Sequence, residues 1–249
     1  MIRIHQLQKK FGRLQALDAI SAQFDRGQVV SLIGPNGSGK TTLIKSILGM
    51  VKPDSGSIEV QGIMINGLPA YREKIGYMPQ IGRYPDNMKI GQLFSMMRAV
   101  RKVPEQDLDT ELLEQFGLPA IFGKSMRTLS GGTRQKVSAA LAFYFRPEIL
   151  ILDEPTAGLD PLSAEILKEK IGKESRKDKP ILITSHILSD LEDLTTHVLY
   201  LQEGKLLWWG GIAVLRRETG EEKLGRAIAR LMQQENKQSS WVGDLSQTV

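Results

Sequence analysis

A glycine-rich loop near the N-terminus has the residue types and the spacing of a phosphate-binding site. Residues 34–41 match the pattern G-x-x-x-x-G-K-[ST], known as a P-loop. Glycines let the backbone turn so that successive N–H groups face phosphate oxygens, and a following helix adds a field that favours an anion. Lys40 can contact the terminal phosphates, and the Thr41 hydroxyl can hold Mg²⁺. The loop predicts a Mg-ATP site made of Gly34, Pro35, Asn36, Gly37, Ser38, Gly39, Lys40, Thr41 and Thr42.

An acidic pair could supply further catalytic groups. Asp153 and Glu154 come directly after the apolar run Ile149–Leu152, which is typical of a buried strand. One carboxylate at the end of a strand can hold Mg²⁺ through water, and a second can orient or deprotonate the attacking water. We assign Asp153 to the metal and Glu154 to the water. An acidic surface loop is the alternative, but the presence of a P-loop favours the catalytic interpretation.

Two further segments could contact the same nucleotide. His186 follows the apolar run Ile181–Ser185, and ligand sites in open α/β sheets lie beyond the carboxyl ends of the strands. Its imidazole could contact the γ-phosphate or orient the water, although a single histidine is more often structural. The helical stretch Arg134–Phe145 follows a second potential anion cradle, formed by Ser130, Gly131 and Gly132.

The apolar patterns predict the sheet that positions these residues. Continuous apolar runs at Val29–Ile33, Ile149–Leu152 and Ile181–Thr184 indicate strands buried on both faces. A helical stretch around Ala164–Glu174 separates the last two, and strand, helix, strand predicts an α/β fold with a parallel sheet.

An antiparallel flap is expected beside this sheet. The first thirty residues alternate and turn like short strands, with Ile2 and Ile4 between polar neighbours. A turn at Lys52–Ser57 precedes the short apolar segment Ile58–Val60.

A helical subdomain is expected at about residues 81–146. Apolar residues recur at helical spacing over residues 88–100 and again over residues 108–116. The acidic start at Pro104–Asp107 suits the N-terminus of the second helix.

The main domain is expected to span residues 1–220. Within it, residues 198–208 are typical of a terminal hairpin with a turn at Glu203-Gly204-Lys205. Residues 221–249 are expected to form a C-terminal amphipathic helix and a polar tail.

Composition and charge set limits on function. The 249 residues are 41% hydrophobic and 24% charged, as in an ordinary globular protein. The formal net charge of +5 is compatible with an anionic partner, but the basic residues are scattered, which favours a mildly basic surface. The absence of cysteine excludes disulfides, thiolate metal sites and a cysteine nucleophile. The N-terminus lacks the apolar run of a signal peptide, and with no apolar run of about 18 residues the chain is not expected to span a membrane by itself.

The order of these motifs resembles that of ABC-transporter nucleotide-binding domains over about residues 1–215. The ordered set comprises the P-loop, Gln80 in Tyr77-Met78-Pro79-Gln80, Leu129–Thr133, Ile149–Glu154, Ala157–Asp160 and His186. The resemblance implies an α/β P-loop NTPase (RecA-like) fold, in which a parallel sheet core carries an antiparallel β flap and an inserted α-helical subdomain. It also implies an ATP hydrolase with ATP and Mg²⁺ as its cofactors.

The resemblance also assigns roles to individual residues. In that family the Ser-Gly-Gly loop binds the γ-phosphate of ATP on the opposite protomer, which implies a head-to-tail dimer with two ATP molecules between the subunits. Gln80 would contact Mg²⁺ and the attacking water, Asp160 would lie at the dimer seam, and Phe11 would stack on adenine. Thr133 departs from the glutamine usual at the end of the signature, which leaves the Ser-Gly-Gly cradle intact.

A membrane partner follows from the same resemblance. A single domain without a membrane segment would dock on separate transmembrane permease subunits at the cytoplasmic face of the cell membrane, and no nucleic-acid partner is expected. The segment Ile81–Met88 lies where the family grips the coupling helix of its permease. An adaptable apolar surface for docking, or simply part of the core, could be formed by Met88, Met96 and Met97.

The sequence also resembles a narrower group. Residues 75–85 and 126–136 are similar to those of NosF-type ATPase subunits, which serve the copper-processing ABC systems that mature nitrous oxide reductase, together with a permease and a periplasmic copper-related protein. Another ABC exporter, of drug or lipid type, is the alternative. A soluble ABC ATPase of DNA repair or translation is disfavoured because the chain has one domain and no coiled-coil insertion. A non-hydrolysing regulatory module is disfavoured by Glu154 and His186.

Overall fold

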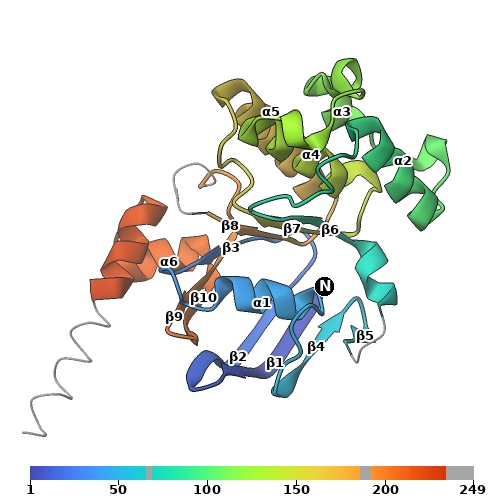
Figure 1. The fold of residues 1–249 in the computed structure, drawn as a ribbon. Coiled ribbons are helices and arrows are strands. Elements are labelled where there is room, and N and C mark those ends of the chain that lie inside the picture. The colour runs from blue at the N-terminus through green and yellow to red at the C-terminus, as the bar shows by residue number, and fades with distance from the viewer. Residues whose placement is uncertain (66–68, 186–191, 234–249) are drawn as a thin grey trace, which may run out of the picture.

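A six-stranded sheet forms the centre of the protein (Figure 1). The computed structural model describes residues 1–65, 69–185 and 192–233. The strand order is β10-β9-β3-β8-β7-β6, with only the edge strand β10 antiparallel to its neighbour. The strands are β3 (Val29–Ile33), β6 (Ile75–Met78), β7 (Ile149–Asp153), β8 (Ile181–Thr184), β9 (His197–Gln202) and β10 (Lys205–Gly211).

The predicted parallel sheet is confirmed, and its strands are buried on both faces as their sequences require. All five residues of β7 are buried. Ile149 and Ile151 pack toward the N-terminal sheet, whereas Leu150 and Leu152 pack toward the helices on the other face. A parallel strand covered on both sides needs apolar residues at every position, which explains the continuous runs.

The predicted antiparallel flap is a separate sheet of order β2-β1-β4-β5. Helix α1 (Lys40–Ile47) lies between it and the central sheet, and Leu43 and Ile44 pack against both (Figure 1). The turn predicted to run to Ser57 ends earlier, because Ser55 and Ser57 already pair with β1. The strands are β1 (Ile2–Phe11), β2 (Leu14–Phe24), β4 (Ser55–Val60) and β5 (Ile63–Met64).

Helices cover the opposite face of the central sheet (Figure 1). Three of them, α2 (Ile90–Arg101), α3 (Glu111–Gln115) and α4 (Gly131–Tyr144), lie between β6 and β7 in the sequence, as the predicted insertion requires. The fourth, α5 (Pro161–Ser175), connects β7 to β8. We refer to the α2–α4 region as the helical subdomain.

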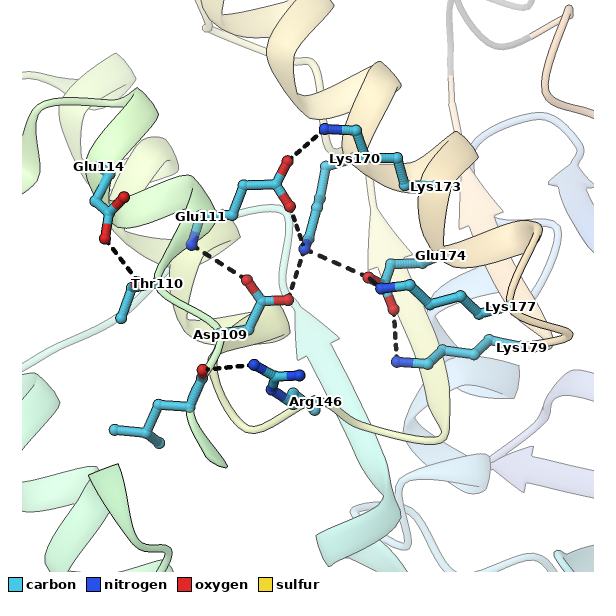
Figure 2. Close-up of polar contacts among 11 residues, drawn as sticks. Asp109, Thr110, Glu111, Glu114, Arg146, Lys170, Lys173, Glu174, Lys177 and Lys179 are labelled. Carbon is cyan, nitrogen blue, oxygen red and sulfur yellow. Dashed lines mark hydrogen bonds and ion pairs between the residues drawn. The ribbon is translucent and has the colours of Figure 1, made fainter. Parts of the chain in front are cut away.

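The prediction of one continuous helix over residues 104–116 is wrong. Only a single turn at Glu105–Asp107 and the short α3 are helical, and Leu108 between them is extended. Tertiary contacts explain the break. Arg146 donates to the Leu108 carbonyl at 3.1 Å (Figure 2). The Asp109 N–H donates to the Tyr144 carbonyl at 2.8 Å. Because these contacts use the backbone groups that a continuous helix would need, propensity is overridden.

The C-terminal part of the described chain packs on the β9–β10 hairpin. Helix α6 (Ile212–Thr219), which the sequence did not predict, is followed by a helix at residues 224–233, where an amphipathic helix was predicted. Leu224 and Ile228 are buried with Tyr200 in a third apolar cluster. The domain boundary at residue 220 stays a prediction, and the polar tail lies outside the described residues. None of the helices described is long and apolar enough to cross a membrane.

Candidate active site

A cavity of about 360 Å³ gathers residues from several of the predicted motifs. The P-loop follows β3, Gln80 follows β6, and the acidic pair closes β7, so the carboxyl ends of three parallel strands meet there. The lining residues are Phe11, Leu14, Ala16, Asn36, Gly37, Ser38, Gly39, Lys40, Thr41, Thr42, Gln80, Asp153 and Glu154.

Two positions of the P-loop, 34 and 39, can be occupied only by glycine. Gly34 has a φ of 155° and Gly39 a φ of 105°, conformations that L side chains rarely adopt. A Cβ on Gly34 would lie 2.1 Å from the Leu201 carbonyl oxygen, and one on Gly39 would lie 2.5 Å from that of Ala16. The loop is therefore held against the hairpin and the flap, and α1 begins directly after it at Lys40.

The polar groups of the loop fit a bound phosphate. Lys40 Nζ donates to the carbonyls of Gly34 and Pro35 at 2.6 and 2.9 Å. Burial lowers the pKa of Lys40, and the nearby carboxylates of Glu154 and Asp153 oppose that shift. The buried Ser38 hydroxyl has no hydrogen-bond partner among the described residues. A buried hydroxyl without a partner beside a folded-back ammonium is compatible with phosphate oxygens as the missing acceptors.

Thr184, at the end of β8, holds the acidic pair. Its hydroxyl donates to Asp153 Oδ1 at 2.5 Å and accepts from the Glu154 N–H at 3.0 Å. Glu154 has a φ of 52°, which is unusual for a residue with a side chain and indicates backbone strain. Sequence analysis missed Thr184, although a polar residue that closes an apolar strand run next to the site was an available signal.

The donor set also fits Mg²⁺. Thr41, Gln80 and Asp153 line the same cavity and offer a hydroxyl, an amide and a carboxylate oxygen. Mg²⁺ prefers oxygen ligands and keeps waters and phosphates in its remaining positions, so a few protein ligands suffice. When bound, the ion would neutralise charge on the phosphates.

The Ser-Gly-Gly loop does not line this cavity. Ser130 is exposed and caps α4, because its Oγ accepts from the Thr133 N–H at 3.2 Å. The hydroxyls of Ser130 and Thr133 lie 2.9 Å apart. Helix α4 consequently begins at Gly131, three residues before the predicted start, with both glycines in its first turn.

Asp160 lies outside the cavity as well and is held against α4. It caps α5 by accepting from the Ser163 N–H at 3.0 Å, and Lys136 Nζ lies 2.8 Å from its Oδ2. Lys136, followed by Ser163, holds the pKa of the Asp160 carboxyl well below its usual range. Sequence analysis did not identify this contact between Lys136 and Asp160.

Of the remaining predicted residues, Phe11, Gly34 and Pro35 are described by the structure and His186 is not. Phe11 is half exposed at the cavity, with Lys9 Nζ 5.3 Å from the centre of its ring. Gly34 and Pro35 contribute their carbonyls to Lys40 but do not line the cavity. His186 lies outside the described residues, so its predicted role stays a prediction.

Comparison with known proteins agrees with this geometry. The family model described as ABC transporter matches residues 17–157. An uncharacterised ABC transporter ATP-binding protein of Bacillus subtilis, YhaQ, is 33% identical over 90% of this chain and 76% of its own length. The Nod factor export ATP-binding protein I of Ralstonia nicotianae is 32% identical over 84% of this chain and 67% of its own length.

A solved structure supports the same assignment. The ATP-binding subunit of an ABC transporter superposes with a TM-score of 0.87 and 28% sequence identity, covering 93% of this chain and 99% of that one. The bacterial ABC transporter cassette MJ0796, which is 22% identical with a TM-score of 0.75, has the same fold and has been solved as a dimer. The chain therefore belongs to the ABC transporter family, as one of its ATP-binding subunits.

Proposed function

We propose that this chain hydrolyses Mg-ATP at sites shared between two head-to-tail copies, and so energises a separate membrane permease. One observation carries the proposal. The P-loop, Gln80 and the acidic pair line one cavity, whereas the exposed Ser130–Gly132 loop lies outside it. A second copy can bring that loop to the nucleotide.

In the proposed reaction each group of the cavity has one task. The P-loop N–H groups and Lys40 bind the phosphates, and Asp153 with Thr41 and Gln80 holds Mg²⁺. Glu154 orients the attacking water and accepts its proton. Phe11 stacks on the adenine. His186, which lies outside the described residues, is assigned the γ-phosphate contact from its position in the sequence alone.

The partner-facing side of the site is supported by contacts within this chain. Lys136 joins Asp160 to α4, and Gln135 Nε2 donates to the Glu154 carbonyl at 3.3 Å. A Cβ on Gly132 would lie 2.7 Å from the Gly158 carbonyl oxygen, so the two loops are in contact. The Ser130–Gly132 loop and Asp160 thus belong to one surface that a second copy can meet.

Mixing two inactive variants tests the shared site. Lys40→Ala removes the P-loop ammonium, and Ser130→Arg blocks the cradle offered to the partner. Each variant alone should lose turnover, while Ser130→Arg still binds ATP as a monomer. In an equimolar mixture, half of the dimers combine an intact P-loop from one copy with an intact Ser130 from the other. Turnover should then recover to about a quarter of the wild-type rate if the two sites are independent.

Glu154→Gln gives the matched control, because its dimers keep both binding elements and lack the proposed base. A mixture that stays at the Glu154→Gln rate, with hetero-dimers demonstrably formed, would contradict a site shared between copies.

The permease is expected to dock in a groove of about 450 Å³ between the central sheet and the helical subdomain. Met96 and Met97 line it, as does Tyr84 from the segment after Gln80. Ile81, in the same segment but outside the lining, is 70% exposed. Met88 and Met97 both pack against the core of the helical side, and Met97 also lines the groove. Met96 is 40% exposed and lines the groove, so it best fits the predicted docking role. A short apolar helix of a permease at the cytoplasmic face of the membrane suits this groove.

The direction and the cargo form the narrower part of the proposal. The similarity to a Nod factor export protein supports an exporter. The similarity of residues 75–85 and 126–136 to NosF-type ATPases supports copper processing for nitrous oxide reductase. Deleting the gene in a host that makes the reductase should leave that enzyme without its full copper content. Normal copper content would leave the other proposal, an exporter of drug or lipid type.

A further inference from the structure

A buried lysine that the proposed reaction does not use lies at the centre of an ion cluster (Figure 2). The Lys170 side chain on α5 is only 2% exposed. Its Nζ lies 2.6 Å from Asp109 Oδ2 and 2.7 Å from Glu111 Oε2, both at the start of α3, and 3.4 Å from Glu174 Oε1 on its own helix. We name the Lys170 cluster from its members, Asp109, Glu111, Lys170, Lys173, Glu174, Lys177 and Lys179.

The other lysines of the cluster complete the pairing of its carboxylates. Lys173 contacts the second oxygen of Glu111 at 2.5 Å, and Lys177 and Lys179 contact Glu174 at 2.8 and 2.5 Å. Burial alone would lower the pKa of Lys170, but hydrogen bonds to Asp109 and Glu111 outweigh it and raise the pKa. Lys170 is therefore charged, and its short contacts are directional.

The cluster fastens one end of α4 to α5. The Asp109 carboxylate accepts a hydrogen bond from Lys170 on α5. The Asp109 N–H donates to the carbonyl of Tyr144, the last residue of α4. Arg146, two residues further on, donates to the Leu108 carbonyl (Figure 2).

A second contact joins the first half of α4 to the start of α5. The Lys136–Asp160 ion pair lies there, about 15 Å along α5 from Lys170, since ten residues at 1.5 Å each separate the two positions. Helix α4 is thus held at two places, through Lys136 in its first half and, by way of Asp109, at its last residue Tyr144, and Ser130 directly precedes it.

Stability alone does not account for this arrangement. Apolar side chains of similar volume in place of a buried ion cluster often stabilise a protein equally well or better. Apolar packing is non-directional, whereas ion pairs of this length fix two segments in one relative position.

We propose that Lys170 is a positioning residue for ATP turnover, which fixes α4 on α5 and thereby fixes where the Ser130–Gly132 loop meets a nucleotide held by a second copy. This inference rests on the shared site proposed above. It assigns no contact with the nucleotide to Lys170.

Three variants separate positioning from stability. Lys170→Met leaves Asp109 and Glu111 as carboxylates without their buried partner. The triple variant Lys170→Met/Asp109→Asn/Glu111→Gln removes the charges together and leaves Glu174 with Lys177 and Lys179. Lys168→Met is the matched control, since Lys168 is on the same helix and pairs with Glu165 outside the cluster. For each variant we would measure the thermal midpoint, the binding of a fluorescent ATP analogue, and turnover per folded subunit at saturating ATP over a series of protein concentrations.

We expect Lys170→Met to lower the thermal midpoint. The triple variant should regain most of that lost midpoint, because it has no unpaired buried charge. Turnover of the triple variant should nevertheless stay about tenfold to a hundredfold below wild type, since a displacement of about 1 Å can cost this much. Binding of the ATP analogue should not change in any variant, and Lys168→Met should match wild type throughout.

Two outcomes would overturn the inference. One is a triple variant that turns over at the wild-type rate. The other is a loss of ATP binding in the triple variant that accounts for its loss of turnover. Failure of the shared site gives a different result, because wild-type turnover would then rise only linearly with protein concentration and would be insensitive to Ser130→Arg.

Discussion

At the scale of single residues, the Thr133 hydroxyl can orient the hydroxyl of Ser130. The family usually has glutamine at this position. A serine hydroxyl has one proton and two acceptor lone pairs. The Thr133 N–H fills one lone pair of Ser130 Oγ, and the Thr133 hydroxyl at 2.9 Å can fill the other. With both lone pairs filled, the proton of Ser130 is left to donate outward, which in the proposed shared site is toward a phosphate oxygen of the partner's nucleotide.

Thr133→Val tests this role, since it keeps the shape of the side chain and removes the hydroxyl. We expect the turnover number to fall roughly twofold to tenfold, the equivalent of one hydrogen bond of about 0.5–1.5 kcal/mol. ATP affinity of the isolated subunit should not change. Thr133→Ser retains the hydroxyl and should behave as wild type in the same steady-state ATPase assay. Equal rates for the valine variant and wild type would show that the hydroxyl has no part in turnover.

At the scale of elements, the C-terminal end of α5 depends on a buried carboxylate. Burial raises the pKa of Glu174, but hydrogen bonds to Lys177 and Lys179 and the charges of Lys179 and Lys170 outweigh it and lower the pKa to about 2. A carboxyl with a lowered pKa in the folded state stabilises that state when it is ionised. This contribution is complete above the ordinary value of 4.5 and is lost as the pH falls toward 2.

Glu174→Gln should therefore be less stable than wild type at neutral pH, and the difference should shrink between pH 4.5 and about 2. Urea unfolding over a pH series measures this directly. Glu165→Gln, on the exposed side of the same helix, removes only the surface pair with Lys168 and serves as the control. A difference between Glu174→Gln and wild type that stayed constant down to pH 2 would argue against the ion pairs as its source.

At the scale of the whole molecule, the groove between the sheet and the helical subdomain is expected to bind the permease. Its lining includes the arginines Arg72, Arg83 and Arg101 and no acidic side chain. Met96 lines the groove, whereas Val100, one turn further along α2, is 71% exposed and does not.

Met96→Arg should therefore weaken recovery of the permease when the complex is purified from detergent-solubilised membranes, and Val100→Arg should not. Neither change touches the nucleotide cavity, so the ATPase rate of the isolated subunit should stay unchanged in both. Equal recovery of the permease with both variants would place the docking surface elsewhere.

Much of the fold followed from local pattern. The run Ile149–Leu152 is apolar throughout, and the run Val29–Ile33 is apolar except for Ser31, because both faces of these strands are covered. That pattern can be recognised in the sequence alone. The strand Ile75–Met78 was not predicted, because Gly76 interrupts its apolar run. The tertiary structure requires glycine at this position, because a Cβ on Gly76 would lie 2.1 Å from the Ala142 carbonyl oxygen.

The sequence by itself determined the chemistry of this protein. A P-loop requires its glycines and its lysine in a fixed local order, and the acidic pair requires only the strand before it, so both can be recognised without knowledge of the fold. Tertiary structure decided which residues support them. Thr184 reaches the acidic pair from a neighbouring strand, and Lys170 reaches Asp109 across 61 positions of sequence. Such contacts depend on how segments pack against each other, and no local pattern encodes that packing.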